Sequence, residues 1–287
     1  MRMFLGKLFL FVLTAIPASA YIPPAKMILS RLAENNGNGV YQIEQEVQLI
    51  AGSETLVIRE TWITAGEKGV RLIAVGQNEL KDKFYHQALY SGGLKWVIEN
   101  NQEGRPQKES QKIPLEMSER PFHIRSTESL VQWLTSLEIL PNNFLQQRPY
   151  LKEKESFVYL KEPYLRLGRA SGSVAYVFGA APTEDPNKNL PGLWVEQDLF
   201  YFRKIRWPSQ NELTVDELGI YPKNLVYPKT RTLRWGNQLA QMQTLSVVAK
   251  SPTTQPLQLL NLDLGRVNTP EGLIQKNILV EFYKRFR

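Results

Sequence analysis

The sequence has 287 residues, of which 35 are lysine or arginine and 28 are aspartate or glutamate, so its formal net charge is +7. It contains no cysteine, which excludes disulfides, a thiolate nucleophile and cysteine-ligated zinc. The length allows one large β domain or two small ones. Because no Ser/Gly-rich linker, low-complexity tract or internal repeat divides the chain, we expect one domain.

The first twenty residues have the three-part layout of a secretory signal peptide. Arg2 and Lys7 lie in the leading segment, Leu8–Ile16 is apolar, and Ala18–Ala20 has the A-x-A form of a cleavage site. We expect cleavage after Ala20 and export of residues 21–287. The alternative is an uncleaved membrane anchor, which the short apolar run disfavours. No cysteine follows the apolar run, so no N-terminal lipid anchor is expected.

A short helix is predicted over residues 23–34, because Pro24 suits a first helical turn and Asn36-Gly37 suits a C-terminal stop. Its apolar stripe consists of Ala25, Ile28, Leu29 and Leu32. We expect this helix to lie on a sheet.

Residues 39–96 predict five consecutive antiparallel strands. In the first strand, polar and apolar residues alternate from Tyr41 to Leu49, and Gln45 is the one polar residue on the apolar face. Glycine-containing turns separate the strands, for example at Gly52 and at Gly92. A sheet of this size must cover its apolar face with other parts of the chain or with a ligand.

The rest of the chain predicts a helical insertion, more strands and a last helix. Residues 99–112 are polar and predict a hairpin tip or a mobile loop, and Ser126 is placed to cap a helix that runs to about Glu138. Strand patterns resume at Ser156, and Thr269-Pro270 opens the final helix. The apolar stripe of that helix contains Leu279, Phe282, Tyr283 and Phe286. The fold class is therefore mainly β with helices (α+β), as one curved antiparallel sheet of about 10–11 strands.

The sequence offers few candidate residues for catalysis. His86 and His123 are the only histidines, and neither has the spacing of a metal site. Glu44 and Glu46 could form a carboxylate pair, although a strand's solvated face explains them more simply. We therefore expect no enzyme, no metal and no cofactor. The basic end of the last helix suits a helix C-terminus, and no nucleic acid is expected as a partner.

Several segments resemble the LolA-like periplasmic family of outer-membrane lipoprotein-sorting carriers. The similar features lie in residues 28–102 and in the later segment PGLWVEQDLFYFRKIRW. They include the helix MILSRLAENN, the strand YQIEQEVQL, Trp62 in ETWIT, and the hairpin LYSGGLKW that ends at Trp96. The sequence departs from the family at Ala65-Gly66, where carriers have an Arg-Pro pair whose arginine latches the lid. Neither Arg59 nor Arg71 is assigned that role.

The resemblance implies an unclosed half-barrel whose helices form a lid, with acyl chains held between sheet and lid in the periplasm. The residues expected to line that cavity are Tyr41, Ile43, Val47, Leu49, Leu56, Ile58, Trp62, Leu130 and Leu134. The alternative for each residue is ordinary core packing.

The function implied is a carrier for the acyl chains of a lipoprotein or lipid in outer-membrane lipoprotein sorting. It would have an inner-membrane donor and an outer-membrane acceptor as partners. The alternative is an RseB-like regulatory module of the cell envelope that senses a lipid or a protein. An enzyme whose site is not visible in the sequence is the third class, because one scaffold can host several functions.

Overall fold

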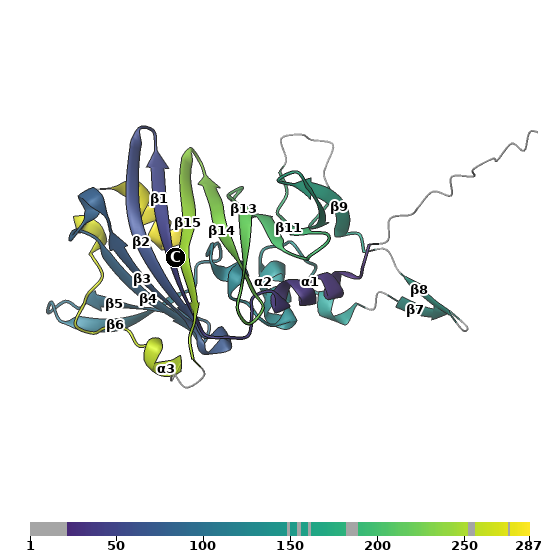
Figure 1. The fold of residues 1–287 in the computed structure, drawn as a ribbon, viewed down its shortest axis with the longest axis horizontal. Coiled ribbons are helices and arrows are strands. Elements are labelled where there is room, and N and C mark those ends of the chain that lie inside the picture. The colour runs from purple at the N-terminus through teal and green to yellow at the C-terminus, as the bar shows by residue number, and fades with distance from the viewer. Residues whose placement is uncertain are drawn as a thin grey trace, which may run out of the picture.

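The computed structural model describes residues 22–147, 150–153, 156–159, 162–181, 189–251, 256–274 and 276–287. Its main element is one antiparallel sheet of thirteen strands, in the order β6-β5-β4-β3-β2-β1-β15-β14-β13-β12-β11-β10-β9 (Figure 1). The two edge strands do not pair with each other, so the sheet is unclosed. The strands of this sheet are β1 (Tyr41–Ala51), β2 (Glu54–Thr64), β3 (Val70–Gly76), β4 (Tyr85–Ser91), β5 (Leu94–Asn100), β6 (Pro106–Lys112), β9 (Leu165–Ala170), β10 (Ser173–Phe178), β11 (Gly192–Glu196), β12 (Phe202–Arg206), β13 (Glu212–Tyr221), β14 (Leu225–Trp235) and β15 (Gln238–Ala249).

Near the middle of the sheet lies β1, which pairs with β2 on one side and with the middle strand, β15, on the other. Tyr41 lies opposite Thr64 in β2 and opposite Ala249 in β15. Buried and half-buried residues alternate along β1, as expected for a strand with one face on the core. The sheet curls, since β1, β2 and β15 stand upright in Figure 1 while β5 and β6 lie across them.

Helices cover the concave face. They are α1 (Ala25–Glu34), α2 (Thr127–Ser136) and α4 (Asn277–Arg285), with a short α3 (Pro256–Leu259) outside them. Ser126 caps α2 as predicted, because its side chain accepts a hydrogen bond from the Ser129 amide at 3.2 Å. The buried residues of α1, α2 and α4 form one continuous core with the inward side chains of the sheet. Short 3-10 turns and a separate hairpin of β7 (Tyr150–Glu153) and β8 (Ser156–Tyr159) complete the described chain.

The predicted fold class is confirmed, and the sheet has more strands than the 10–11 expected. Residues 101–105 form the expected hairpin tip, but Pro106–Lys112 is a paired edge strand whose polar, exposed residues give no alternation to detect. Glu212–Tyr221 was not predicted either. Its pairing with β14 is irregular between Val215 and Leu218, and such bulges disrupt the period of two.

Within the described residues, no helix is both long enough and apolar enough to cross a bilayer. The predicted signal peptide, residues 1–20, lies outside the described residues, and so does its cleavage site after Ala20.

Candidate functional site

The nine residues predicted to line a cavity all lie on the concave side of the sheet or on α2, and all are buried. Four come from β1, three from β2 and two from α2. Leu130 is 2% exposed and the other eight are 0% exposed, and all belong to the continuous core. The chain's own side chains cover them in this state, so their contact with a ligand stays a prediction.

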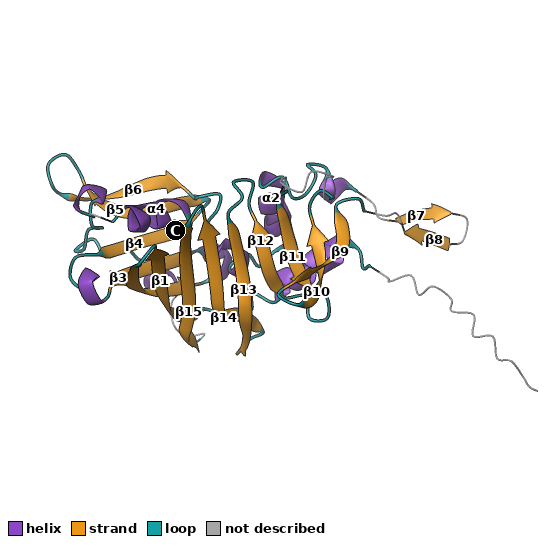
Figure 2. Ribbon diagram, turned by 90° about the horizontal axis from the view of Figure 1, so that it is seen from above, coloured by secondary structure: helices purple, strands orange, loops and turns teal. Residues whose placement is uncertain are grey.

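Part of the cover of the sheet is α4, which lies against its inner face and contacts β1 (Figure 2). The predicted stripe is confirmed as its buried face. The rings of Phe282 and Phe286 pack on Trp235 of β14 at centroid distances of 6.0 and 5.2 Å. Tyr283 packs on Phe84, just before β4, at 4.9 Å. The sequence predicted this helix but assigned the lid to α2, because a stripe does not show which surface it will cover.

A network of buried charges lies beneath α4. Arg287, just beyond the helix, is 0% exposed and its Nε donates to Glu60 Oε1 on β2 at 2.8 Å. The Tyr283 hydroxyl donates to the same carboxylate oxygen at 2.8 Å, and Arg287 also donates to the Ser118 hydroxyl. Lys95 of β5 donates to the Arg287 backbone carbonyl at 2.9 Å. Polar contacts therefore tie the end of α4 to two strands and to a loop.

A second carboxylate extends the network towards β14. Glu119 pairs with Arg231, whose guanidinium also donates to the Gln45 side-chain oxygen at 2.5 Å. The Tyr227 hydroxyl donates to Glu119 at 2.7 Å, and Arg287 Nη2 lies 3.7 Å from the same residue. Two carboxylates thus face two guanidinium groups, so the charges of these four side chains balance. Buried ion pairs need this balance, because desolvation of an unpaired charge costs several kcal/mol.

The network sets the protonation of its neighbours. Burial by itself would raise the pKa of Glu119, but the positive charges of Arg231 and Arg287 outweigh burial and lower it to about 2. Burial lowers the pKa of His123 to about 4, although the nearby Glu119 carboxylate opposes the shift. His123 is therefore neutral at pH 7, and its contact with Glu119 at 3.9 Å is not an ion pair there.

This network was not predicted from the sequence, although the sequence carries a signal for part of it. On β2 the inward positions are Leu56, Ile58 and Trp62, and the same period places Glu60 among them. Gln45 was noticed on the apolar face of β1, where it now donates to Glu60 at 2.6 Å. A charged residue at an inward position predicts a buried partner of opposite charge, but the alternation along a strand does not show which residue that partner is.

Two clefts flank residues 269–274 beside α4. The first, the β5 cleft, has a volume of about 500 Å³. Its lining includes Phe84, His86, Lys95, Val97, Val280 and Tyr283. The second, the β3–β4 cleft, has a volume of about 600 Å³. Its lining includes Leu80, Phe84, Leu273, Ile274, Lys276 and Leu279. Both volumes lie within the range of ligand sites, and none of the nine predicted residues lines either cleft.

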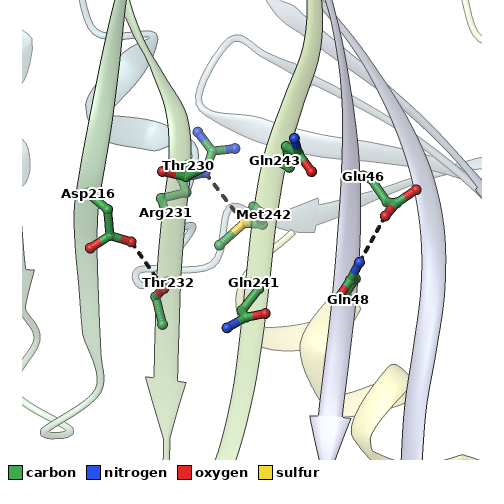
Figure 3. Close-up of a pocket in the computed structure, with 9 residues that line it drawn as sticks. All are labelled: Glu46, Gln48, Asp216, Thr230, Arg231, Thr232, Gln241, Met242 and Gln243. Atoms are coloured by element: carbon green, nitrogen blue, oxygen red, sulfur yellow. Dashed lines mark hydrogen bonds between the residues drawn. The ribbon is translucent and has the colours of Figure 1, made fainter.

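A further pocket of about 250 Å³ lies across β13, β14, β15 and β1. Figure 3 shows its polar lining, in which Asp216 accepts from the Thr232 hydroxyl at 3.4 Å and Gln48 donates to Glu46 at 3.0 Å. Arg231 Nε contacts the Met242 sulfur at 3.4 Å, so the buried network reaches this pocket. Glu46 is held here by a neighbouring glutamine, in agreement with its reading as part of a polar strand face.

The histidines do not assemble a catalytic group. His86 packs on Tyr283 at a centroid distance of 5.0 Å, and His123 packs on Trp62 at 5.7 Å. Burial lowers the pKa of His86 well below its ordinary value, with Lys95 and Arg287 contributing in the same direction. In the part of the chain that the structure describes, no three His, Asp or Glu residues are placed to hold a metal ion.

No protein-family model matches the sequence, and no curated protein matches it. Solved structures with a similar fold were found. A LolA superfamily protein from Nitrosomonas europaea has a TM-score of 0.49 and 12% identity, over 83% of this chain and 97% of that one. An outer membrane lipoprotein-sorting protein domain from Vibrio parahaemolyticus has a TM-score of 0.47 and 12% identity, over 82% of this chain and 97% of that one.

The complex of MucA and MucB from Pseudomonas aeruginosa gives a TM-score of 0.30 and 12% identity. That match covers 83% of this chain and 60% of the other. All three TM-scores lie below 0.5, so the description of the fold rests on this chain's own strand order, an unclosed antiparallel sheet.

Proposed function

We propose that the protein is a periplasmic carrier that holds the acyl chains of a lipoprotein or lipid between its curved sheet and α4, for delivery to the outer membrane. The observation that carries the proposal is the pair of clefts beside α4 on an unclosed sheet. Apolar side chains such as Val280 and Leu279 supply part of each lining, beside charged residues such as Glu99 in the β5 cleft and Lys276 in the β3–β4 cleft. The signal-peptide layout of residues 1–20 supports export.

The driving force for such binding is large. Burial of an acyl chain contributes about 0.8 kcal/mol per methylene, so a chain of ordinary length offsets the loss of several helix contacts. The predicted residues of β1 and β2 that lie beneath α4 are reached by a ligand only when α4 moves away. In this mechanism the clefts admit the end of the chain, α4 lifts, and the apolar face of β1 and β2 accepts the rest. The donor and acceptor would be membrane proteins on either side of the periplasm.

A cross-link that holds α4 closed tests this mechanism. Lys276, next to the start of α4, pairs with Glu54 at the start of β2, and both side chains are more than a third exposed. The chain has no cysteine, so Glu54→Cys with Lys276→Cys introduces the only two thiols, which a short bismaleimide can join. The matched control is Glu217→Cys with Lys229→Cys, another exposed ion pair, at 2.6 Å between β13 and β14.

The readout is binding of a fluorescent fatty acid, together with mass spectrometry of lipid bound to the gently purified protein. We expect the uncross-linked variants and the cross-linked control to bind, and the α4-locked protein to lose binding. Equal binding by the locked protein would show that α4 is not the lid. If neither purified lipid nor probe binds to any form, acyl carriage is wrong.

One observation favours the second function, an RseB-like sensor. The interior is filled by α4 and closed by buried ion pairs, as expected for a module whose resting state holds no cargo and whose output is a change in α4. In that case a lipid or protein signal would release α4 and alter binding to a regulatory partner. Purified protein free of lipid, whose α4 amides exchange faster after addition of lipid, would favour the sensor over the carrier.

A further inference from the structure

A separate pocket of about 650 Å³ lies at the end of the sheet where β2 turns into β3. We call it the rim pocket. Its lining includes Glu34, Asn38, Gly66, Lys68, Arg125 and Asn224. It shares no lining residue with the two clefts beside α4, so its occupation is a question independent of acyl carriage.

Arg125 brings an uncompensated charge to this pocket. Its Nε and Nη2 are buried and have no hydrogen-bond partner among the described residues, where no carboxylate pairs with it either. Its guanidinium lies 5.6 Å from the Tyr41 ring centre, which fixes the side chain without neutralising it. Burial lowers the pKa of Arg125 from its ordinary value, but a guanidinium stays protonated at pH 7. Arg125 is half-buried and Nη1 is not among its buried atoms, so its unpaired positive charge faces the pocket and favours an anionic ligand.

The surroundings of Arg125 are built for close approach. Gly66 has a φ of +64°, and a Cβ added there would lie 2.8 Å from Arg125 Nη1, so the guanidinium rests on bare backbone. Lys68, two residues later, lines the pocket with a second cation. Glu34 also lines the pocket, but its carboxylate already pairs with Arg31 at 3.0 Å.

We propose that the rim pocket binds a phosphate group, with Arg125 as its main donor and Lys68 as a second cation. A planar guanidinium fork matches the oxygens of phosphate in a bidentate geometry. The pocket is larger than one phosphate and lies within the range of small-molecule sites, so the group can belong to free inorganic phosphate or to a phospholipid headgroup. Phosphate fits two cations better than a carboxylate because it carries more charge and a third oxygen.

Titration of the full exported chain, residues 21–287, tests the proposal by NMR at constant ionic strength. The probes are inorganic phosphate, acetate, and dihexanoyl phosphatidic acid below its micellar concentration. The readouts are the Gly66 and Lys68 amide signals and the Arg125 Nε–Hε signal. We expect saturable shifts with both phosphate probes and weaker binding of acetate. Arg125→Gln should weaken phosphate binding about tenfold or more, as expected for loss of a charged donor.

Two more variants complete the design. Lys68→Gln changes an exposed residue, so it should fold normally and weaken binding about threefold. Arg203→Gln is the matched control, because Arg203 also has an unpartnered Nε within the described chain but lies outside the rim pocket. This variant should bind phosphate as tightly as the wild type. If Arg125→Gln does not fold, Lys68→Gln decides.

The two sources of phosphate are distinguished by the probes. Phosphatidic acid that binds at least tenfold more tightly than inorganic phosphate identifies a lipid headgroup, and equal affinities identify the free ion; both support the site. No saturable shift in the wild type, or affinities unchanged in Arg125→Gln and Lys68→Gln, overturns it. The α4-locked protein should bind phosphate normally, so failure of acyl carriage and failure of the rim pocket can be told apart.

Discussion

Arg287 and Glu60 are 227 residues apart in the sequence, yet Arg287 Nε lies 2.8 Å from Glu60 Oε1 and neither side chain is exposed. Their contact joins the end of α4 to the second strand of the sheet. Glu60 also accepts from Trp62 Nε1 at 3.0 Å and from Gln45, so four donors converge on one carboxylate when Tyr283 is included. Such a group cannot be removed without leaving buried donors unsatisfied.

Glu60→Gln should destabilise the protein by about 3 kcal/mol. The substitution keeps the shape of the side chain but leaves Arg287 with only the more distant Glu119 as a carboxylate partner. When one partner of a buried ion pair is lost, the desolvation cost of the other charge is no longer compensated. Urea unfolding followed by circular dichroism measures the change. Glu217→Gln is the control, because it breaks the exposed pair with Lys229 and should change the stability far less. A loss below 1 kcal/mol in Glu60→Gln would mean that the pair does not hold α4.

Stability should fall as the pH drops from 6.5 to 4, partly because of His123. The folded state lowers the pKa of this residue to about 4 by burial, with Arg125, Arg231 and Arg287 acting in the same direction and Glu119 against it. The unfolded chain therefore binds more protons than the folded chain in this range, and a falling pH stabilises the unfolded state relative to the folded one. The slope contributed by one such group is at most about 1.4 kcal/mol per pH unit.

His123→Phe tests this prediction. Both ring nitrogens of His123 lack hydrogen-bond partners in the described structure, so a phenyl ring should be tolerated at pH 7. The variant should lose less stability than the wild type between pH 6.5 and 4, as measured by unfolding in urea at each pH. His86 keeps its own contribution in both proteins, since its pKa is lowered as well. Parallel pH profiles for wild type and variant would contradict the role of His123.

The fold could be predicted where periodicity is regular. β1 alternates regularly, with Gln45 as the one polar residue on its buried face, and the five-strand run was found from this pattern together with the glycine-containing turns. Prediction failed where the local rule is broken. β6 is polar on both faces because it is an edge strand, and β13 contains bulges that shift its inward residues.

The site was harder to predict because its parts are distant in sequence. The apolar positions of β1 and β2 were identified, but their cover by α4 depends on a helix more than two hundred residues away. Glu60 could have been recognised as an inward charge by its period. Its pairing with Arg287 could not have been predicted, because the periodicity of a sequence does not show which strand the end of a distant helix will contact.

Stability should rise with pH between about 8 and 10.5 because of Lys95. Burial lowers the pKa of this residue to about 8, with Arg287 contributing, while Glu99 and Glu271 oppose the shift. The unfolded lysine keeps its proton to about pH 10.5, so in this window the unfolded chain binds more protons and a higher pH favours the folded state. Lys95→Met should flatten the profile measured by urea unfolding. A variant with the same slope as the wild type would show that another group is responsible.

Val280→Trp should block acyl binding without unfolding the protein. Val280 lies on α4 and lines the β5 cleft, and a larger side chain there would fill space that a ligand needs. In the closed state the added ring would contact the wall of the cleft. The substitution should therefore also favour the closed position of α4. We expect at least a tenfold loss of affinity for a fluorescent fatty acid, with a loss of unfolding free energy of about 1 kcal/mol, the lower end of the cost of added volume, because Val280 is only half-buried.

Ile220→Trp supplies the control for added aromatic surface, because Ile220 on β13 is 74% exposed and lines neither cleft. It should leave the affinity unchanged. If Val280→Trp binds the fatty acid as tightly as the wild type while the α4-locked protein does not, the ligand enters through the β3–β4 cleft instead. If both bind normally, the acyl chain is held outside α4, because neither filling its cleft nor fixing its position would then matter.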